Sequence, residues 1–215
     1  MRQTELDFGG ERAREPFADG AFVLRGFALP DAAALLRDLD GVVARAPFRH
    51  MQTPGGKRMA AGMSNCGALG WVSDRRGYRY ERVDPMTGLP WPSMPSSFAA
   101  LAAAAADAAG YPGFAPDACL INRYEPGAGM GMHADEDERD FSQPIVSVSL
   151  GLPMTFRFGG ARRGGPTTRV PLAHGDVLVW GGPSRRCYHA VSPLKPGEHP
   201  LLGACRVNLT LRAAG

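Results

Sequence analysis

Residues 205–212 read CRVNLTLR, and the regular alternation of this segment decides the fold. Its apolar positions are Cys205, Val207, Leu209 and Leu211, and its polar positions are Arg206, Asn208, Thr210 and Arg212. Since successive side chains of a β-strand point to opposite faces, the pattern predicts a strand with one apolar and one polar face. A strand with one side in water, which is common in antiparallel sheets, has the same pattern.

The two arginines give the polar face of this strand a chemical character. Arg206 and Arg212 stand six residues apart, or about 20 Å along an extended strand, and their long side chains can lean toward a ligand between them. A guanidinium group binds both oxygens of a carboxylate through its planar fork. The spacing therefore favours a small dicarboxylate with one anionic group at each end.

Similar segments precede this strand. From residue 117 onward, short apolar or alternating segments are separated by turns rich in glycine and proline: ACLINRY, PIVSVSLG, MTFRFGG and GDVLVWGG. Upstream, leucine and valine at helical spacing predict a helix between Asp31 and Pro47, and an alanine-rich helix is predicted over residues 96–109. We therefore expect an α+β chain with two helices and a C-terminal β-sandwich, barrel or jelly roll.

Length and composition suit one folded domain. The 215 residues are 44% hydrophobic and 21% charged, which is enough apolar material for a core. The polar residues 1–14 predict a flexible tail, which leaves a single domain over residues 15–215. Residues 49–95 are rich in glycine, proline, aromatic residues and arginine, as in a substrate-recognition lid or an ordinary surface meander.

Charge and cysteine content give only coarse information about the partners and the cellular compartment of the protein. The net charge of +3 permits a nucleic-acid partner without demanding one. Only Lys57 and Lys195 are lysines, and the arginine excess indicates a coding bias. Four scattered cysteines without a CxxC pair, and no secretory signal or membrane span, predict a reduced, cytoplasmic protein. Nothing in the sequence requires more than a monomer or an obligate protein partner.

Three residues form a candidate metal site. His133 and Asp135 stand two apart, so their side chains point to the same side of an extended chain. His189 follows the predicted strand GDVLVWGG, and two histidines with one carboxylate suit non-heme iron(II) with open coordination positions. HxD also occurs by chance, a lone histidine is more often structural, and the neighbouring Asp137 and Glu138 resemble a solvated acidic run.

Taken together, these segments resemble the AlkB family of Fe(II)/2-oxoglutarate-dependent nucleic-acid dealkylases, most closely its bacterial members. The similar stretches are MQTPGG, MSNCGALGW, PDACLINRY, PIVSVSLGLP, HGDVLVWGG and CRVNLTLR, which span most of residues 20–215. The RxNxxxR form of the last stretch is a strong family signature. The resemblance implies a double-stranded β-helix (jelly-roll) core with N-terminal helices and residues 49–95 as a nucleotide-recognition lid.

The resemblance also implies a role for each matching residue. The implied iron(II) ligands are His133, Asp135 and His189. The implied 2-oxoglutarate-binding residues are Asn122, Tyr124, Arg206, Asn208 and Arg212, with Arg206 at the distal carboxylate and Arg212 near the metal-side carboxylate. The implied substrate residues are Trp71, Tyr78, Asp137, Met63, Ser147 and Arg163, with Trp71 stacking on the extruded base. One departure is Glu136, where the family commonly has lysine, which weakens the attraction for phosphate along this edge.

The implied activity is oxidative demethylation of N-alkylated bases such as 1-methyladenine and 3-methylcytosine. It consumes 2-oxoglutarate and O₂ and releases formaldehyde, succinate and CO₂, as direct-reversal repair of DNA, with single strands favoured, or of RNA. One alternative is a 2-oxoglutarate-dependent hydroxylase or demethylase that acts on a protein or a small molecule and needs no aromatic lid. Another is a jelly-roll binding module without catalysis, against which the open metal triad argues.

Overall fold

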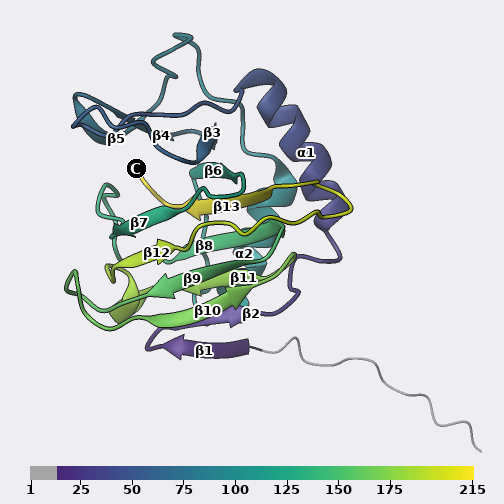
Figure 1. The fold of residues 1–215 in the computed structure, drawn as a ribbon, viewed down its shortest axis with the longest axis vertical. Helices are drawn as coiled ribbons and strands as arrows, with labels where there is room; N and C mark the ends of the chain where they lie inside the picture. The colour runs from purple at the N-terminus through teal and green to yellow at the C-terminus, as the bar shows by residue number, and fades with distance from the viewer. Residues whose placement is uncertain (1–13) are drawn as a thin grey trace, which may run out of the picture.

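The alternating segment forms a strand, as predicted. In the computed structural model, which describes residues 14–215, this strand is β13 (Arg206–Arg212), an interior strand of a seven-stranded sheet. The strand order is β1-β2-β11-β8-β13-β6-β3, and every neighbouring pair is antiparallel. Its other members are β1 (Arg14–Ala18), β2 (Ala21–Leu24), β3 (Gly62–Gly67), β6 (Ala118–Tyr124), β8 (Ile145–Gly151) and β11 (Val177–Trp180). Figure 1 shows β13 beside β8 and β6.

A second, four-stranded sheet completes a jelly roll. It has the order β10-β9-β12-β7 and contains β7 (Met130–His133), β9 (Met154–Phe158), β10 (Thr168–Leu172) and β12 (His189–Val191). Apolar side chains of both sheets share one cluster, in which Phe156 and Phe158 of the minor sheet pack with Ile145 and Trp180 of the major sheet. The two sheets therefore face each other, which confirms the predicted double-stranded β-helix core.

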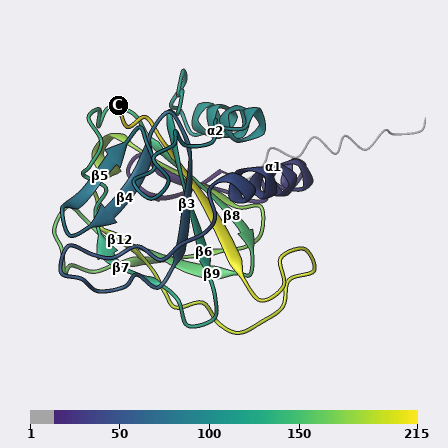
Figure 2. The same ribbon diagram turned by 90° about the horizontal axis from the view of Figure 1, so that it is seen from above.

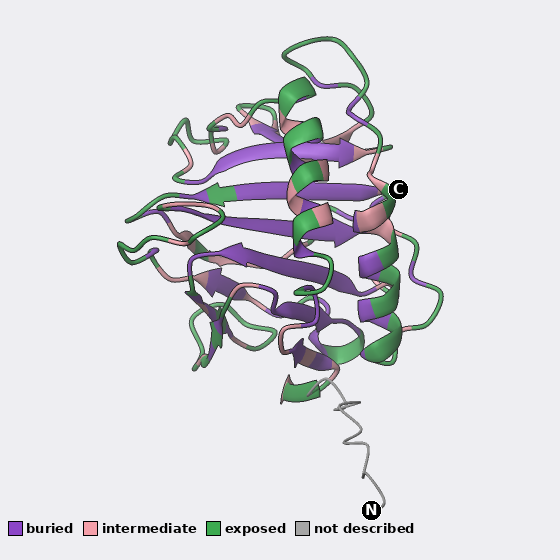
Figure 3. Ribbon diagram, turned by 90° about the vertical axis from the view of Figure 1, so that its right-hand side faces the viewer, coloured by how far each residue is buried: buried purple, intermediate pink, exposed green. Residues whose placement is uncertain are grey.

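Both predicted helices are present and cover the outer face of the major sheet. They are α1 (Ala32–Arg45) and α2 (Ser96–Ala108). Leu35 and Leu39 of α1 and Phe98 of α2 share the main core cluster with Val148 of β8 and Leu209 of β13. Figure 2 shows the helices on one side of the major sheet, with β7, β9 and β12 on the other, and Figure 3 shows their exposed outer sides.

The polar face of β13 points into the jelly roll, not into water. All seven residues of the strand are buried, and Arg206 and Arg212 are only 2% and 6% exposed. The apolar face packs under the helices, since Val207, Leu209 and Leu211 belong to the main core cluster. The structure therefore excludes the alternative of an ordinary strand with one wet side, because the second sheet encloses the polar face.

Residues 49–95 contain two different kinds of structure. β3 is an edge strand of the major sheet and pairs with β6 over its full length, so it is part of the core. β4 (Gly70–Asp74) and β5 (Gly77–Glu81) form a separate two-stranded hairpin. The buried Trp91 holds the base of this hairpin, because its Nε1 donates to the Glu81 carbonyl at 2.9 Å and a Cβ at Gly70 would lie 2.3 Å from its ring.

The N-terminal strands were not predicted. The expected tail, residues 1–14, lies outside the described residues except for Arg14, which already begins β1. β1 is a five-residue edge strand that contains Pro16, and proline in an edge strand disrupts no internal ladder. None of the helices in residues 14–215 is long and apolar enough to traverse a bilayer.

Candidate metal and co-substrate site

A cavity of about 560 Å³ lies between the two sheets. Every residue predicted for the site lines it: His133, Asp135, His189, Asn122, Tyr124, Arg206, Asn208, Arg212, Trp71, Tyr78, Asp137, Met63, Ser147 and Arg163. The inner faces of β13, β6 and β8 form one wall, and β7, β9 and β12 contribute to the opposite wall. Residues more than 140 positions apart in sequence therefore meet in one enclosed space.

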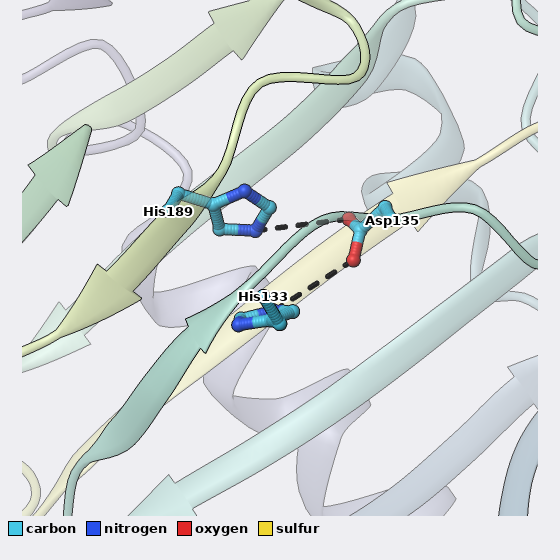
Figure 4. A group of neighbouring side chains, drawn as sticks. All are labelled: His133, Asp135 and His189. Carbon is cyan, nitrogen blue, oxygen red and sulfur yellow. Dashed lines mark ion pairs between the residues drawn. The ribbon is translucent and has the colours of Figure 1, made fainter. Parts of the chain in front are cut away.

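Strand pairing brings the two candidate histidine ligands together. His133 ends β7 and His189 begins β12, and the two are direct partners in the antiparallel ladder. Their ring centroids lie 4.3 Å apart. Asp135 follows two residues after His133, and the ligand atoms of all three residues lie within 4.8 Å of one another. Figure 4 shows both imidazoles turned toward the Asp135 carboxylate.

Hydrogen bonds fix which imidazole nitrogen is available. Nδ1 of His133 lies 2.8 Å from the Gly131 carbonyl, and Nδ1 of His189 lies 3.1 Å from the Cys187 carbonyl. Since a carbonyl only accepts, each Nδ1 carries a proton, and Nε2 is the ring nitrogen left to bind a metal. The Nε2 atoms lie 3.7 and 3.9 Å from the Asp135 carboxylate oxygens. Such carbonyl contacts are the usual means by which proteins orient histidine toward a metal.

The charge states of these groups also suit a cation. Burial lowers the pKa of His189 to about 4, so this imidazole is neutral near pH 7. Burial by itself would raise the pKa of Asp135, but Arg212 and the two histidines lower it well below its ordinary value. Phe156 and Trp180 pack against His189, with ring centroids 5.5 and 5.2 Å away, and hold it in an apolar setting. Two imidazoles and one carboxylate are a donor set that fits iron(II).

A buried ion network supports the carboxylate ligand. Arg212 donates to Asp135 Oδ2 from Nη2 at 2.6 Å and from Nε at 3.1 Å, and its Nε also lies 3.2 Å from Glu138 Oε1. Arg185 Nη2 pairs with Glu138 Oε2 at 3.2 Å, and the Tyr80 hydroxyl donates to Glu138 Oε1 at 2.7 Å. Glu138 thus joins the β4–β5 hairpin to the arginine beside the candidate metal ligand.

Arg206 has no such acidic partner. Its Nη2 donates to Ser149 Oγ at 2.8 Å, while its buried Nε has no hydrogen-bond partner. Burial lowers the pKa of Arg206 to about 10, and within residues 14–215 no carboxylate pairs with it. An unpaired buried cation is costly. Arg206 therefore fits a bound anion, as a free carboxylate group of a ligand in the cavity would provide.

The amides of the cavity wall offer further contacts. Asn208 Nδ2 donates to Ser147 Oγ at 2.8 Å and to the Val148 carbonyl at 3.0 Å, and its Oδ1 accepts from Thr210 Oγ1 at 2.8 Å. The buried Asn122 Oδ1 has no partner. Buried polar atoms are normally satisfied in folded proteins. The wall therefore combines an unpaired cation with an open polar position, which suits a small oxygen-rich acid.

Aromatic side chains from the hairpin form the remaining side of the cavity. The rings of Trp71 and Tyr78 are stacked at 5.5 Å with an angle of 14°. Trp71 Nε1 donates to Asp137 Oδ2 at 2.7 Å, and Asn65 holds the backbone of Trp71 on both sides. Burial raises the pKa of Asp137. The hairpin thus holds a flat aromatic surface against the cavity that contains the triad.

Sequence reasoning missed several residues that shape the site. Glu138 resembled part of a solvated acidic run, but its side chain is only 2% exposed. The signal for Tyr80 was present, because it stands two residues after Tyr78 and therefore shares its face of β5. In the same hairpin, Arg79 is paired with Asp74 and Glu81.

The network around Glu138 gives a stability prediction. We expect Glu138→Gln to lower the free energy of unfolding by about 3 kcal/mol, because removal of this buried charge leaves Arg185 without a carboxylate partner and leaves Arg212 with Asp135 alone. Urea unfolding measures this change. The matched control is Glu136→Gln, where an exposed pair with Arg186 at 3.5 Å is lost and the change should stay below about 1 kcal/mol. Equal unfolding midpoints for the two variants would contradict the network.

The fold and donor set define an iron(II)- and 2-oxoglutarate-dependent dioxygenase. The model of the 2OG-Fe(II) oxygenase superfamily matches residues 20–212. The alpha-ketoglutarate-dependent dioxygenase AlkB of Escherichia coli is 57% identical over 211 residues, covering 98% of both chains. Accordingly, the chain belongs to the AlkB family, and its cofactors are Fe(II), 2-oxoglutarate and O₂.

Two further relatives extend this comparison. The solved structure of OsALKBH1 superposes with a TM-score of 0.83 at 28% identity, covering 93% of this chain and 99% of that one. The nucleic acid dioxygenase ALKBH1 of Mus musculus is 37% identical over 106 residues, which is 49% of this chain and 27% of the relative. The jelly-roll frame is therefore shared across most of the OsALKBH1 chain.

Proposed function

We propose that the protein demethylates N-alkylated nucleobases, of the 1-methyladenine and 3-methylcytosine type, in DNA or RNA as direct-reversal repair. The reaction consumes 2-oxoglutarate and O₂ and releases formaldehyde, succinate and CO₂. One observation supports this substrate class above others: the stacked pair of Trp71 and Tyr78 presents a flat aromatic surface to the cavity that holds the metal triad. Two of the relatives, the dioxygenase AlkB of Escherichia coli and the nucleic acid dioxygenase ALKBH1 of Mus musculus, agree with it.

For the metal, we assign His133, Asp135 and His189 as the iron(II) ligands. The support is their mutual proximity and the two Nε2 atoms that hydrogen bonding leaves free. Bound iron(II), with 2-oxoglutarate and O₂, supplies the oxidising power that removes hydrogen from an N-methyl group. Arg212 keeps the Asp135 carboxylate ionised and in place.

For the co-substrate, we assign Arg206 to the distal carboxylate of 2-oxoglutarate and Arg212 to the region of the metal-side carboxylate. Arg206 is a buried cation without an acidic partner, and Asn122, which pairs with Asn208 in the ladder, has an unpaired buried oxygen in the same cavity wall. Tyr124 and Asn208 complete this end of the site. Their fixed positions hold the dicarboxylate in one orientation, which is the protein's contribution to such chemistry.

For the substrate, we assign Trp71 as the surface on which the extruded base stacks, opposite His133. Extrusion of a base costs a few kcal/mol, least at damaged or single-stranded sites, and stacking returns about 1–3 kcal/mol per base. We assign Asp137, whose carboxylate accepts a hydrogen bond from Trp71, as the acceptor for the exocyclic amine of the base. The remaining assigned pocket residues are Tyr78, Met63, Ser147 and Arg163.

We also propose the cellular and domain setting. The β4–β5 hairpin and its flanking loops act as the lid within residues 49–95, and residues 15–215 work as one catalytic domain after a flexible tail. We propose a monomer that acts on single strands in the cytoplasm without an obligate protein partner. All four cysteines are free, which fits a reducing compartment.

The role of Trp71 can be tested by substitution. We expect Trp71→Ala to lower kcat/KM for a methylated oligonucleotide by about 10- to 100-fold, because the stacking surface is lost. Trp71→Phe, which keeps a ring but loses the donor to Asp137, should retain more activity than Trp71→Ala. Iron(II) affinity should be equal in all three proteins. Normal repair by Trp71→Ala would contradict the proposed stacking role.

The alternative function is hydroxylation of a protein or a small molecule by the same metal site. The two functions differ in what stimulates turnover of 2-oxoglutarate. We expect succinate formation to rise with a methylated oligonucleotide and to remain at its basal level with the unmethylated oligonucleotide. Equal succinate formation with both, and no base restored, would exclude the demethylase and favour the second function.

A further inference from the structure

A second groove, of about 650 Å³, lies next to the cavity of the metal site. β7 and Arg163 line both, so the groove begins where the cavity ends. Arg157 of β9 lines the groove but not the cavity. It is exposed, while its neighbours Phe156 and Phe158 point into the core, so the groove lies on the face of the minor sheet that is turned away from the core.

The groove is positively charged. Arg157 and Arg163 are the charged side chains in its lining, which contains no aspartate or glutamate. Arg163 Nη2 donates to the Met132 carbonyl at 3.0 Å, and Arg157 has one long contact of 3.5 Å to Thr167 Oγ1. Within residues 14–215 neither guanidinium forms an ion pair. Two cations with most of their donors unused therefore face the same open space.

The walls leave room for an extended chain. Four glycines, Gly129, Gly131, Gly164 and Gly165, line the groove. A Cβ at Gly131 or Gly164 would meet nothing within 4 Å, so the space above the backbone is open there. β7 is an edge strand of the minor sheet, with β12 on one side only. Thr167 and Ser192 add hydroxyl groups. Guanidinium, hydroxyl and main-chain groups are the usual partners of phosphate oxygens.

The charge changes sign along this edge of the protein. Beyond the end of β7, residues 135–140 carry exposed carboxylates such as Glu136 and Asp140, which repel phosphate. Along β7 itself the adjoining groove carries only positive charge. A polyanion whose base enters the cavity is therefore favoured on the groove side and disfavoured on the acidic side.

We propose that this groove binds the phosphodiester backbone of the same nucleic-acid strand whose base enters the cavity, with Arg157 as its main contact. This inference rests on the proposed function and adds a path for the strand outside the catalytic cavity. The contact lies beyond the target nucleotide, so it contributes to affinity for long substrates and not to the chemical step. A planar guanidinium suits phosphate because it offers two parallel N–H donors.

The test compares substrate lengths and salt dependence. The full chain with iron(II) and 2-oxoglutarate is titrated anaerobically with fluorescent single strands carrying one 1-methyladenine, either a trinucleotide or about 15 nucleotides long. Arg157→Gln should weaken binding of the long strand about fivefold, as expected for a partly exposed charge-assisted contact, and leave the trinucleotide unchanged. The slope of log Kd against log salt should fall by about 0.7, which is the contribution of one phosphate on a single strand.

The control variants separate a groove contact from net charge. Arg157→Lys should recover most of the salt slope, and Arg37→Gln on the exposed side of α1 should behave as the wild type. Equal weakening by Arg157→Gln and Arg37→Gln, or equal loss for both strand lengths, would overturn the proposal. A different result would also overturn the proposal: inorganic phosphate raises the melting temperature of the wild type but not that of Arg157→Gln, while both proteins bind the strand equally well. Failure of the wild type to restore a methylated base would instead overturn the proposed function.

Discussion

Replacement of Arg206 by methionine is expected to abolish productive 2-oxoglutarate binding and, at the same time, to stabilise the protein in the absence of 2-oxoglutarate. The two effects have one cause. Arg206 is 2% exposed, its Nε is unpaired, and no carboxylate of residues 14–215 balances its charge. The uncompensated charge of Arg206 therefore destabilises the folded protein until the distal carboxylate of the co-substrate binds.

The expected magnitudes follow from the energetics of buried charge. Loss of one partner from a buried charge pair costs about 2–5 kcal/mol, so kcat/KM for 2-oxoglutarate should fall by about a thousandfold. Replacement of a buried, uncompensated charge by an apolar side chain of similar length should raise the free energy of unfolding by about 1–4 kcal/mol. Loss of function together with a gain of stability is the trade-off expected where an active-site residue destabilises the fold.

Thermal unfolding with and without 2-oxoglutarate measures both effects. The wild type should gain about 2.7 kcal/mol at a ligand concentration one hundred times its Kd, and Arg206→Met should gain nothing at the same concentration. Arg206→Lys is the matched control, since it keeps the charge but loses the planar fork. A wild-type thermal shift in Arg206→Met, or destabilisation of that variant without ligand, would show that Arg206 has a structural role.

The second large effect is expected at Asp135. We expect Asp135→Asn to reduce iron(II) affinity and activity by more than about a thousandfold, because loss of a partner that merely orients a ligand already costs about 10- to 100-fold. The substitution preserves the size of the side chain but removes the charge that attracts both the metal and Arg212. The two imidazoles are then left beside a cationic guanidinium, which repels the metal.

Anaerobic titration with iron(II) measures the affinity. Asp137→Asn is the matched control, because Asp137 lies two residues further on and its carboxylate accepts from Trp71 instead of facing the histidines. That control should bind iron(II) as the wild type does. Retention of iron(II) affinity by Asp135→Asn would refute the assignment of this carboxylate as a ligand.

The sequence predicted β13 and both helices because the patterns that indicate them are local. Alternation over residues 205–212 depends on strand geometry alone, and β13 matches it from Arg206 to Arg212. Leucine and valine spacing placed α1 in the same way, and the alanine-rich segment with Gly110 at its end placed α2, where Gly110 adopts φ +90°. Periodicity, capping and turn residues are properties of neighbouring positions, so they are readable without tertiary structure.

The parts that escaped prediction depend on contacts between distant residues. The polar face of β13 is enclosed only because a second sheet covers it, and no pattern within the strand records that. β12 has three residues and β7 has four, which is too short for a periodic signal. The link from Tyr80 through Glu138 to Arg212 joins three separate segments of the chain. The pairing of His133 with His189 in the antiparallel ladder sets the geometry of the three candidate ligands, and the sequence spacing alone does not specify that pairing.

The measurement that tests the demethylase function most directly is the product balance of the wild type. The full chain is supplied with iron(II), 2-oxoglutarate, O₂ and a single-stranded oligonucleotide that carries one 1-methyladenine or 3-methylcytosine. We expect restored base, formaldehyde and succinate in equal amounts, and no restored base when iron(II) or 2-oxoglutarate is withheld. Succinate formed without any restored base or formaldehyde would contradict the proposed function.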